Sequence, residues 1–267
     1  MAITAYDILD WVTTQSGHPI GPDEGVSFGP ARQEVRGLSV CWMPDPPAIR
    51  AAADAGHQLL IHHEALTHPY PGLACGGCGH EAERQYLAWK TNAQRLTALG
   101  QAGLTSCRVH GSADDISNFQ ACADMLGLSR CVAGEGWSRV FEIEPVPYGE
   151  LIERVKAATG MPALRATCCE GMGRVVRRVG MPWGGLGLFT NVWFMQGLIE
   201  HGLDVMIAGE SDNYGMRFCT EVGVDLIETS HEISENPGLA AFAERLAEAF
   251  PDLDVRFIDQ PCVWRMA

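Results

Sequence analysis

The chain has 267 residues, with 33 acidic and 19 basic side chains and a formal net charge of −14. Nucleic acids and anionic membrane surfaces are bound by clustered Lys and Arg, so this charge argues against both as partners. Hydrophobic residues make up 46% of the chain and charged residues 19%, which is typical of a globular protein rather than a disordered one. The length predicts one large or two medium domains.

Three features bear on the cell compartment and predict the cytoplasm. The N-terminus lacks the basic and apolar regions of a signal peptide. The uncharged segment 179–199 is long enough to span a bilayer, but its glycines and Pro182 predict a strand end, a glycine turn and a buried helix instead. The ten cysteines are too dispersed for a disulfide framework. They are better explained as mostly buried free thiols of a reducing compartment.

The first half of the chain alternates between helix and strand patterns. They predict a helix over 5–15, a turn-rich stretch that ends near Arg36, a strand over 37–42, a helix over 46–56, a strand over 58–61, a helix over 81–103, a strand over 106–110 and a helix over 115–127. The helix over 46–56 has proline at its start and glycine at its end. The strand over 58–61 is apolar on both faces, as a central parallel strand should be.

The second half repeats this alternation. The predicted elements are strands over 139–144, 163–168, 174–179, 204–208, 225–229 and 255–258, and helices over 148–159, 188–201, 214–222 and 239–250. Alternating strands and helices predict an α/β fold with mainly parallel or mixed sheets.

Ligands of open parallel sheets collect beyond the carboxyl ends of strands, and three predicted strands end in polar residues. The first ends in His62 and His63, followed by Glu64. Neighbouring residues of a strand point to different sides, so each histidine could hold one ion of a metal pair. The alternative is one histidine satisfied in the core and one on the surface.

The other two strand ends allow the same two kinds of interpretation. Asp114 follows His110 closely and is either a ligand or a helix cap. His231 and Glu235 are four residues apart, so they either share one helical face or bracket a loop between strand and helix. Imidazole and carboxylate together suit Zn, Fe, Ni or Mn. The alternative for Glu235 is a charge that complements a helix N-terminus.

Taken in order, these segments resemble the GTP cyclohydrolase I type 2-like family, also called Ngg-interacting-factor-three-like proteins. Its signature is a His-His pair, an H-T-N-x-D segment and a late G-H-x-x-[ST]-E segment, which correspond here to 62–63, 110–114 and 230–235. The segments 23–26 and 208–210 also resemble its D-N-x-G-L turn and T-G-E strand end. This chain departs from the family at Glu64, where proline is usual, and at Gly111 and Ser112, so its substrate is open.

The resemblance implies two interlocked α/β domains with a dinuclear metal site in the cleft between them, and a ring-shaped homohexamer. One domain would be 1–128, with 236–267 returning to it, and the other 129–235. The implied ligands of two divalent transition-metal ions (Zn, Fe, Mn or Ni) are His62, His63, Asp114, His231 and Glu235. The implied activity is hydrolysis by metal-activated water, as in GTP cyclohydrolase chemistry, with Glu210 or Glu64 as proton acceptor. The alternatives are a metal-binding scaffold or metallochaperone without turnover, and an oligomeric interaction protein with a vestigial site.

Two weaker signals remain. Cys75, Cys78 and His80, with His68 nearby, could form a second metal cluster or, less readily, a redox pair, but a glycine-rich loop with incidental thiols explains them slightly better. Gly184, Gly185 and Gly187 could present backbone amides to a phosphate group. A tight turn from strand to helix is the better-supported interpretation of these glycines.

Overall fold

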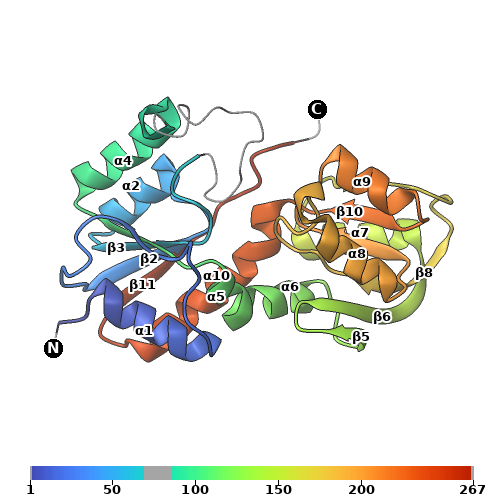
Figure 1. Ribbon diagram of the computed structural model, residues 1–267, viewed down its shortest axis with the longest axis horizontal. Helices are drawn as coiled ribbons and strands as arrows, with labels where there is room; N and C mark the ends of the chain where they lie inside the picture. Colours follow the sequence, from blue (N-terminus) through green and yellow to red (C-terminus); the bar gives the residue numbers. More distant parts are fainter. Residues whose placement is uncertain (1, 69–85, 266–267) are drawn as a thin grey trace. The chain divides into compact units, whose positions relative to one another are not determined.

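The structure is a computed structural model that describes residues 2–68 and 86–265 (Figure 1). The chain divides into two compact units. Unit 1 comprises Met1–Asn118 and Gly238–Asp259, and unit 2 comprises Phe119–Pro237 and Gln260–Ala267. Each unit contains one mixed sheet with helices packed on it, which confirms the predicted α/β class with mixed sheets.

The sheet of unit 1 has five strands in the order β1-β4-β3-β2-β11. Strands β4, β3, β2 and β11 run parallel, and β1 pairs with β4 antiparallel. The elements of this unit are α1 (Ala5–Ser16), β1 (Gly25–Phe28), β2 (Gly37–Cys41), α2 (Pro46–Asp54), β3 (Leu59–His62), the 3₁₀ turn η1 (Tyr86–Ala88), α4 (Lys90–Ala102), β4 (Thr105–Arg108), α5 (Gly111–Ala113), the π-helical turn η2 (Asp114–Asn118), the second part of α10 (His231–Ala249) and β11 (Asp254–Ile258).

Alternate residues of the central strands of unit 1 face opposite sides of the sheet. Leu38 and Val40 of β2 and Ile61 of β3 pack with α1 and α10, whereas Leu60 of β3 packs with α2 and α4. Figure 1 shows these two helix pairs on opposite faces of the sheet. Strands covered on both faces are mostly apolar, which explains the apolar run Leu59-Leu60-Ile61 in β3.

The sheet of unit 2 has six strands in the order β5-β6-β8-β9-β10-β7. Strands β8, β9 and β10 run parallel, and the other pairs are antiparallel. The elements are α6 (Phe119–Met125), β5 (Cys131–Glu135), β6 (Ser138–Pro147), α7 (Tyr148–Thr159), β7 (Arg165–Ala166), β8 (Val175–Gly180), η3 (Phe189–Asn191), α8 (Val192–Glu200), β9 (Val205–Ala208), α9 (Asn213–Thr220), β10 (Asp225–Glu228) and the first part of α10.

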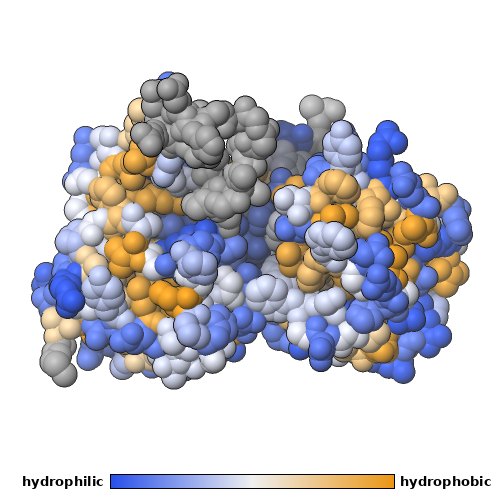
Figure 2. Space-filling model, in the orientation of Figure 1, coloured by the Kyte–Doolittle hydropathy of each residue, from blue (hydrophilic) through white to orange (hydrophobic). Residues whose placement is uncertain are grey.

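Unit 2 also has an apolar cluster on each face of its sheet. Val205 and Ile207 of β9 pack with α6 and α7, and Met206 and Ala208 of the same strand pack with α8 and α9. Figure 2 shows hydrophilic residues interspersed with smaller apolar areas on the visible face of both units. No helix among the described residues has the length and apolar character that a membrane span requires. Segment 179–199 contains the end of β8, a turn, η3 and most of α8.

Several predicted element boundaries are wrong. The turn-rich stretch before Arg36 contains β1, which is only four residues long and lies among turn residues. The exposed strand β5 has no predicted counterpart, because its residues show no alternating apolar pattern. The helix predicted over 115–127 is confirmed as a helix, but its first turns are the π-helical η2 and it ends with α6 at Met125. The strand predicted over 163–168 is reduced to the two residues of β7. Of the helix predicted over 81–103, residues 86–88 form η1 and the α-helix begins at Lys90.

The last predicted helix begins at His231 rather than at residue 239. Pro237 lies inside it and cannot donate a backbone hydrogen bond to the fourth preceding carbonyl. The folded chain tolerates this proline within the second turn of α10.

Candidate metal centre

His62, the last residue of β3, is fully buried and uses both ring nitrogens in hydrogen bonds. Its Nδ1 donates to the backbone oxygen of Glu64 at 2.7 Å, and its Nε2 lies 3.0 Å from the hydroxyl of Ser27 on β1. Burial lowers the pKa of His62 to about 3, so the ring is neutral near pH 7, which is the form that binds metals. To bind an ion, His62 must exchange one of these hydrogen bonds.

His63 points to a different side of the chain, as neighbouring strand residues do. Its Nδ1 donates to the backbone oxygen of Val109 at 3.2 Å, and its Nε2 lies 3.7 Å from Oδ1 of Asp114. A carbonyl only accepts hydrogen bonds, so Nδ1 carries a proton, and Nε2 is the ring nitrogen that lies beside the carboxylate. A hydrogen bond of this kind fixes the tautomer of metal-binding histidines.

His110 belongs to the same group of side chains, although the predicted ligand set lacks it. Its ring centroid is 4.8 Å from that of His63, and its Nδ1 lies 3.1 Å from Oδ2 of Asp23. One ligand atom each of His63, Glu64 and His110 lies within 4.8 Å of the others. Burial lowers the pKa of His110 to about 4. The sequence did hold a sign of this role, because His110 lies at the end of a predicted strand and begins the H-x-x-x-D segment that ends at Asp114.

Glu24 fixes the loop that leads to Asp114. Its carboxylate accepts hydrogen bonds from the amides of Gly21, His110 (2.6 Å) and Ser112 (3.0 Å) and from the Ser112 hydroxyl (2.8 Å). Burial raises the pKa of Glu24, but these hydrogen bonds outweigh it and lower the pKa overall. The ionised carboxylate therefore holds the turn between β4 and η2.

The equivalent position in unit 2 is the start of α10. His231 and Glu235 lie on one face of this helix, with Nε2 of His231 3.4 Å from Oε2 of Glu235. Nδ1 of His231 donates to Oε2 of Glu210, which follows β9, at 3.1 Å. Ser230, just before the helix, has φ +99° and is the one residue other than glycine with positive φ in the described parts of the chain.

Gly184 and Gly185 leave room for these two side chains. A Cβ atom at Gly184 would lie 2.1 Å from Oε1 of Glu235, and one at Gly185 would lie 3.1 Å from the His231 ring. The Gly184 amide donates to the Ser234 hydroxyl at 2.9 Å. These observations explain why glycine is needed here, while phosphate binding by Gly184, Gly185 and Gly187 stays a prediction.

The predicted ligands are therefore distributed over both units. His62, His63 and Asp114 belong to unit 1, and His231 and Glu235 belong to unit 2. Within each unit the structure brings an imidazole and a carboxylate together, and it adds Glu64 and His110 in unit 1. Cys75, Cys78 and His80 lie outside the described residues.

The fold and these side chains define a class, namely two-unit α/β proteins with candidate metal ligands at strand ends. The chain belongs to the Duf34/NIF3 (NGG1p interacting factor 3) family, whose model matches residues 21–262. It is 32% identical over 130 residues to the GTP cyclohydrolase 1 type 2 homolog of Yersinia pestis. That match covers 45% of this chain and about half of the relative, 49% of its length.

Solved structures are similar in fold. A Bacillus cereus protein related to NIF3 matches with a TM-score of 0.79 and 10% identity, covering 100% of both chains. A Staphylococcus aureus hypothetical protein matches with a TM-score of 0.75 and 13% identity, also covering 100% of both chains. At these identities the likeness concerns the fold alone.

Proposed function

We propose that the protein binds two divalent transition-metal ions and uses them for hydrolysis, in the manner implied by GTP cyclohydrolase I type 2-like proteins. One observation carries this proposal. In each unit a histidine has Nδ1 held by an acceptor of the protein and Nε2 directed at a carboxylate: His63 with Val109 and Asp114, and His231 with Glu210 and Glu235. Imidazoles oriented in this way are typical of metal ligands.

The donor set fits the proposed ions. Neutral imidazoles and carboxylates suit Zn, Fe, Mn or Ni better than Ca or Mg. The proposed ligands are His62, His63, Asp114, His231 and Glu235, with His110 and Glu64 added from the geometry of unit 1. The glycines at 184 and 185 support the assignment, because larger residues would displace Glu235 and His231.

When bound, such ions supply a water of lowered pKa and polarise the bond under attack. The residues of the chain have separate tasks. Glu210, whose side chain is about half exposed (48%), holds the proton on Nδ1 of His231 and is the proposed proton acceptor. Glu64 is buried among the imidazoles, which favours a ligand role over proton transfer. Asp23 orients His110 through its Nδ1.

Metal analysis of the full chain, as purified and after incubation with Zn, Fe(II), Mn or Ni, tests the binding proposal. We expect about two ions per chain, and clearly fewer for the variants His62→Ala, His63→Ala and Glu235→Ala. His201→Ala is the matched control, because His201 is exposed and outside the ligand set. A parent protein that takes up none of these metals contradicts the proposal.

Turnover by the metal-loaded protein tests the hydrolase proposal separately. We expect metal-dependent hydrolysis within a panel of GTP, phosphoesters and uncharged aromatic amides, and a loss of rate in Glu210→Gln at metal concentrations that keep the site filled. A loaded protein that turns over none of them is instead a metal-binding scaffold or metallochaperone. We further propose that the protein is a homohexamer in the cytoplasm. Light scattering of the purified protein measures its oligomeric state.

A further inference from the structure

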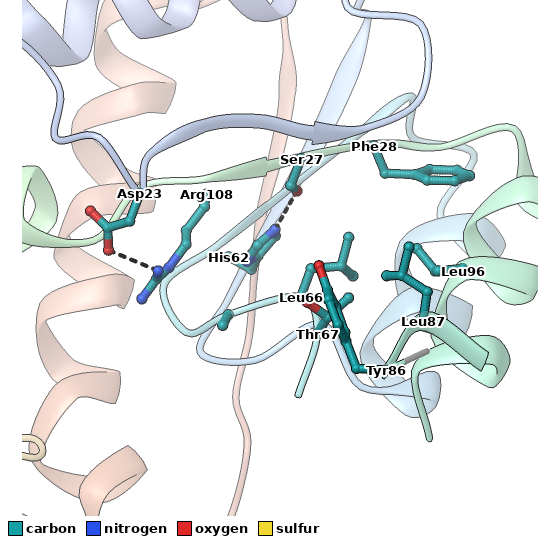
Figure 3. Close-up of a pocket in the computed structure, with 11 residues that line it drawn as sticks. Asp23, Ser27, Phe28, His62, Leu66, Thr67, Tyr86, Leu87, Leu96 and Arg108 are labelled. Carbon is teal, nitrogen blue, oxygen red and sulfur yellow. Dashed lines mark hydrogen bonds and ion pairs between the residues drawn. The ribbon is translucent and has the colours of Figure 1, made fainter. Parts of the chain in front are cut away.

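Unit 1 contains a cavity of about 440 Å³ next to the end of β3 (Figure 3). This volume lies within the range of pockets that hold small organic molecules, roughly 300–1,000 Å³. The described residues that line the cavity come from β1 and the turn before it, the ends of β3 and β4, the segment after β3, η1 and α4, and they belong to unit 1.

The two ends of this cavity differ in chemistry. Figure 3 shows Asp23, Arg108, His62 and Ser27 at one end. The other end is formed by the apolar side chains of Phe28, Leu66, Leu87 and Leu96 and by the ring of Tyr86. Rings and branched aliphatic chains of this kind bind an aromatic ring by contact area and by offset or edge-to-face packing.

The polar end carries little net charge. Arg108 is the one Lys or Arg among the described lining residues, and its Nη1 donates to Asp23 at 2.8 Å. Its Nε donates to the backbone oxygen of His63 at 2.9 Å. A guanidinium neutralised in this way is poorly suited to a polyphosphate, which needs several cationic donors. The carboxylate of Asp23 and the guanidinium of Arg108 compensate each other in charge, which suits an uncharged amide or hydroxyl better than an ion.

The polar end also touches the candidate ligands. Asp23 accepts a hydrogen bond from the His110 ring, and Arg108 donates one to the backbone oxygen of His63. His62 itself lines the cavity. A molecule with its ring among the leucines and its polar group at Asp23 and Arg108 would therefore have the polar group at the strand ends that carry the ligands.

We propose that this cavity binds the non-reacting aromatic part of an uncharged amphipathic substrate, whose amide or hydroxyl end faces Asp23 and Arg108. This inference rests on the proposed function for treating the ligand as a substrate. It narrows the substrate class, because the described part of the cavity provides apolar contact for a ring and no uncompensated cation for a phosphate chain.

The test is a titration of the metal-free full chain with indole-3-acetamide, a bicyclic ring with a neutral amide, followed by ligand-observed NMR and calorimetry. We expect saturable binding of one molecule per chain, with a Kd of about 1 mM or lower for a probe of this size. Leu96→Trp fills the apolar end and should weaken binding at least tenfold. Sodium tripolyphosphate should not displace the probe.

A second variant keeps the test conclusive if Leu96→Trp does not fold. Leu87 is 48% exposed, so Leu87→Glu should fold normally and should still weaken binding, because it brings a carboxylate to the apolar end. Val222→Glu, at an exposed valine of unit 2, is the matched control and should bind as the parent does. Absence of saturable binding, unchanged binding in Leu87→Glu, or displacement by tripolyphosphate overturns the proposal.

Metal uptake measured on the same preparations separates this inference from the proposed function. Normal metal uptake without probe binding overturns the cavity proposal alone. Probe binding that depends on Leu87 and Leu96, in a protein that takes up no metal, supports a ligand cavity and overturns the metal proposal.

Discussion

The carboxylate of Glu24 accepts four hydrogen bonds, three of them from the segment that leads from β4 to Asp114. Its partners His110 and Ser112 are 86 and 88 residues away in the sequence. No local pattern could have predicted this contact, because it arises only when β1 pairs with β4. Glu24 thus positions a candidate ligand loop without being a ligand itself.

Replacing Glu24 with Gln should lower the free energy of unfolding by about 1–3 kcal/mol, because one charged acceptor is lost and an amide NH₂ faces backbone donors. Glu34→Gln, at an exposed glutamate of the same unit, should have almost no effect. Urea unfolding of the metal-free proteins measures both. Equal midpoints for Glu24→Gln and the parent would contradict this account of the loop.

At the residue scale the sequence pointed to candidate ligands, whereas the contacts around them came only from the structure. His63, His231 and Glu235 could be picked out as polar residues at strand ends, and each lies beside a partner of suitable chemistry. The roles of Ser27, Asp23 and Gly184 could not be predicted, because they depend on contacts between strands and turns far apart in the chain. His110 was predictable in position but not in its approach to His63.

Among the elements, the helices with clear start and stop signals were predicted best. Helix α2 begins with prolines after Asp45, whose side chain accepts from the Ala48 amide at 2.8 Å. The central strands were predicted because both of their faces are buried and apolar. Strands β1 and β5 were missed because partly exposed strands show no such pattern.

The first helix provides a prediction about pH. Asp7 accepts hydrogen bonds from the Thr4 hydroxyl at 2.6 Å and the Thr4 amide at 2.8 Å, and these bonds lower the pKa of Asp7 below its ordinary value of 3.8. A carboxyl group with a lowered folded pKa stabilises the protein fully above its unfolded pKa. That contribution is lost as the pH falls through the folded pKa.

Asp7→Asn should therefore be less stable than the parent at pH 7, and the difference should shrink as the pH falls below about 4. Thermal unfolding of both proteins at a series of pH values measures this. Asp10→Asn, at an exposed position of the same helix, serves as control and should show a smaller difference at pH 7. A difference for Asp7→Asn that is constant down to pH 3 would show that its charge is irrelevant.

At the scale of the whole molecule, each unit has its own sheet and its own apolar clusters. The alternation of strands and helices predicted this class of fold. The predicted domains, 1–128 with 236–267 and 129–235, stay a prediction. The two compact units divide at Asn118 and Pro237, between the consecutive helical segments η2 and α6 and inside α10, where no change of composition marks a boundary. The net charge of −14 argues against nucleic acid as a partner, and this stays a prediction.

Metal binding should also register in the stability of the whole chain. An ion at a hundred times its Kd adds about 2.7 kcal/mol to the folded state, which corresponds to a rise in Tm of about 5–10 °C for a protein of this size. Zn or Mn added to the metal-free protein should produce this rise, and a chelator should reverse it. His63→Ala should lack the rise and His201→Ala should retain it. An equal rise in all three proteins would assign the effect to metal bound elsewhere.

The backbone at Ser230 has a consequence for how this site tolerates substitution. A φ of +99° is open to glycine and strained for other residues, and glycine is the residue that the family signature has before this histidine. The Ser230 hydroxyl donates to Glu232 at 2.6 Å and partly offsets the strain. The backbone shape at this position therefore limits which residues fit it. Glycine and small polar residues should be tolerated at residue 230, whereas β-branched residues should be strongly strained there.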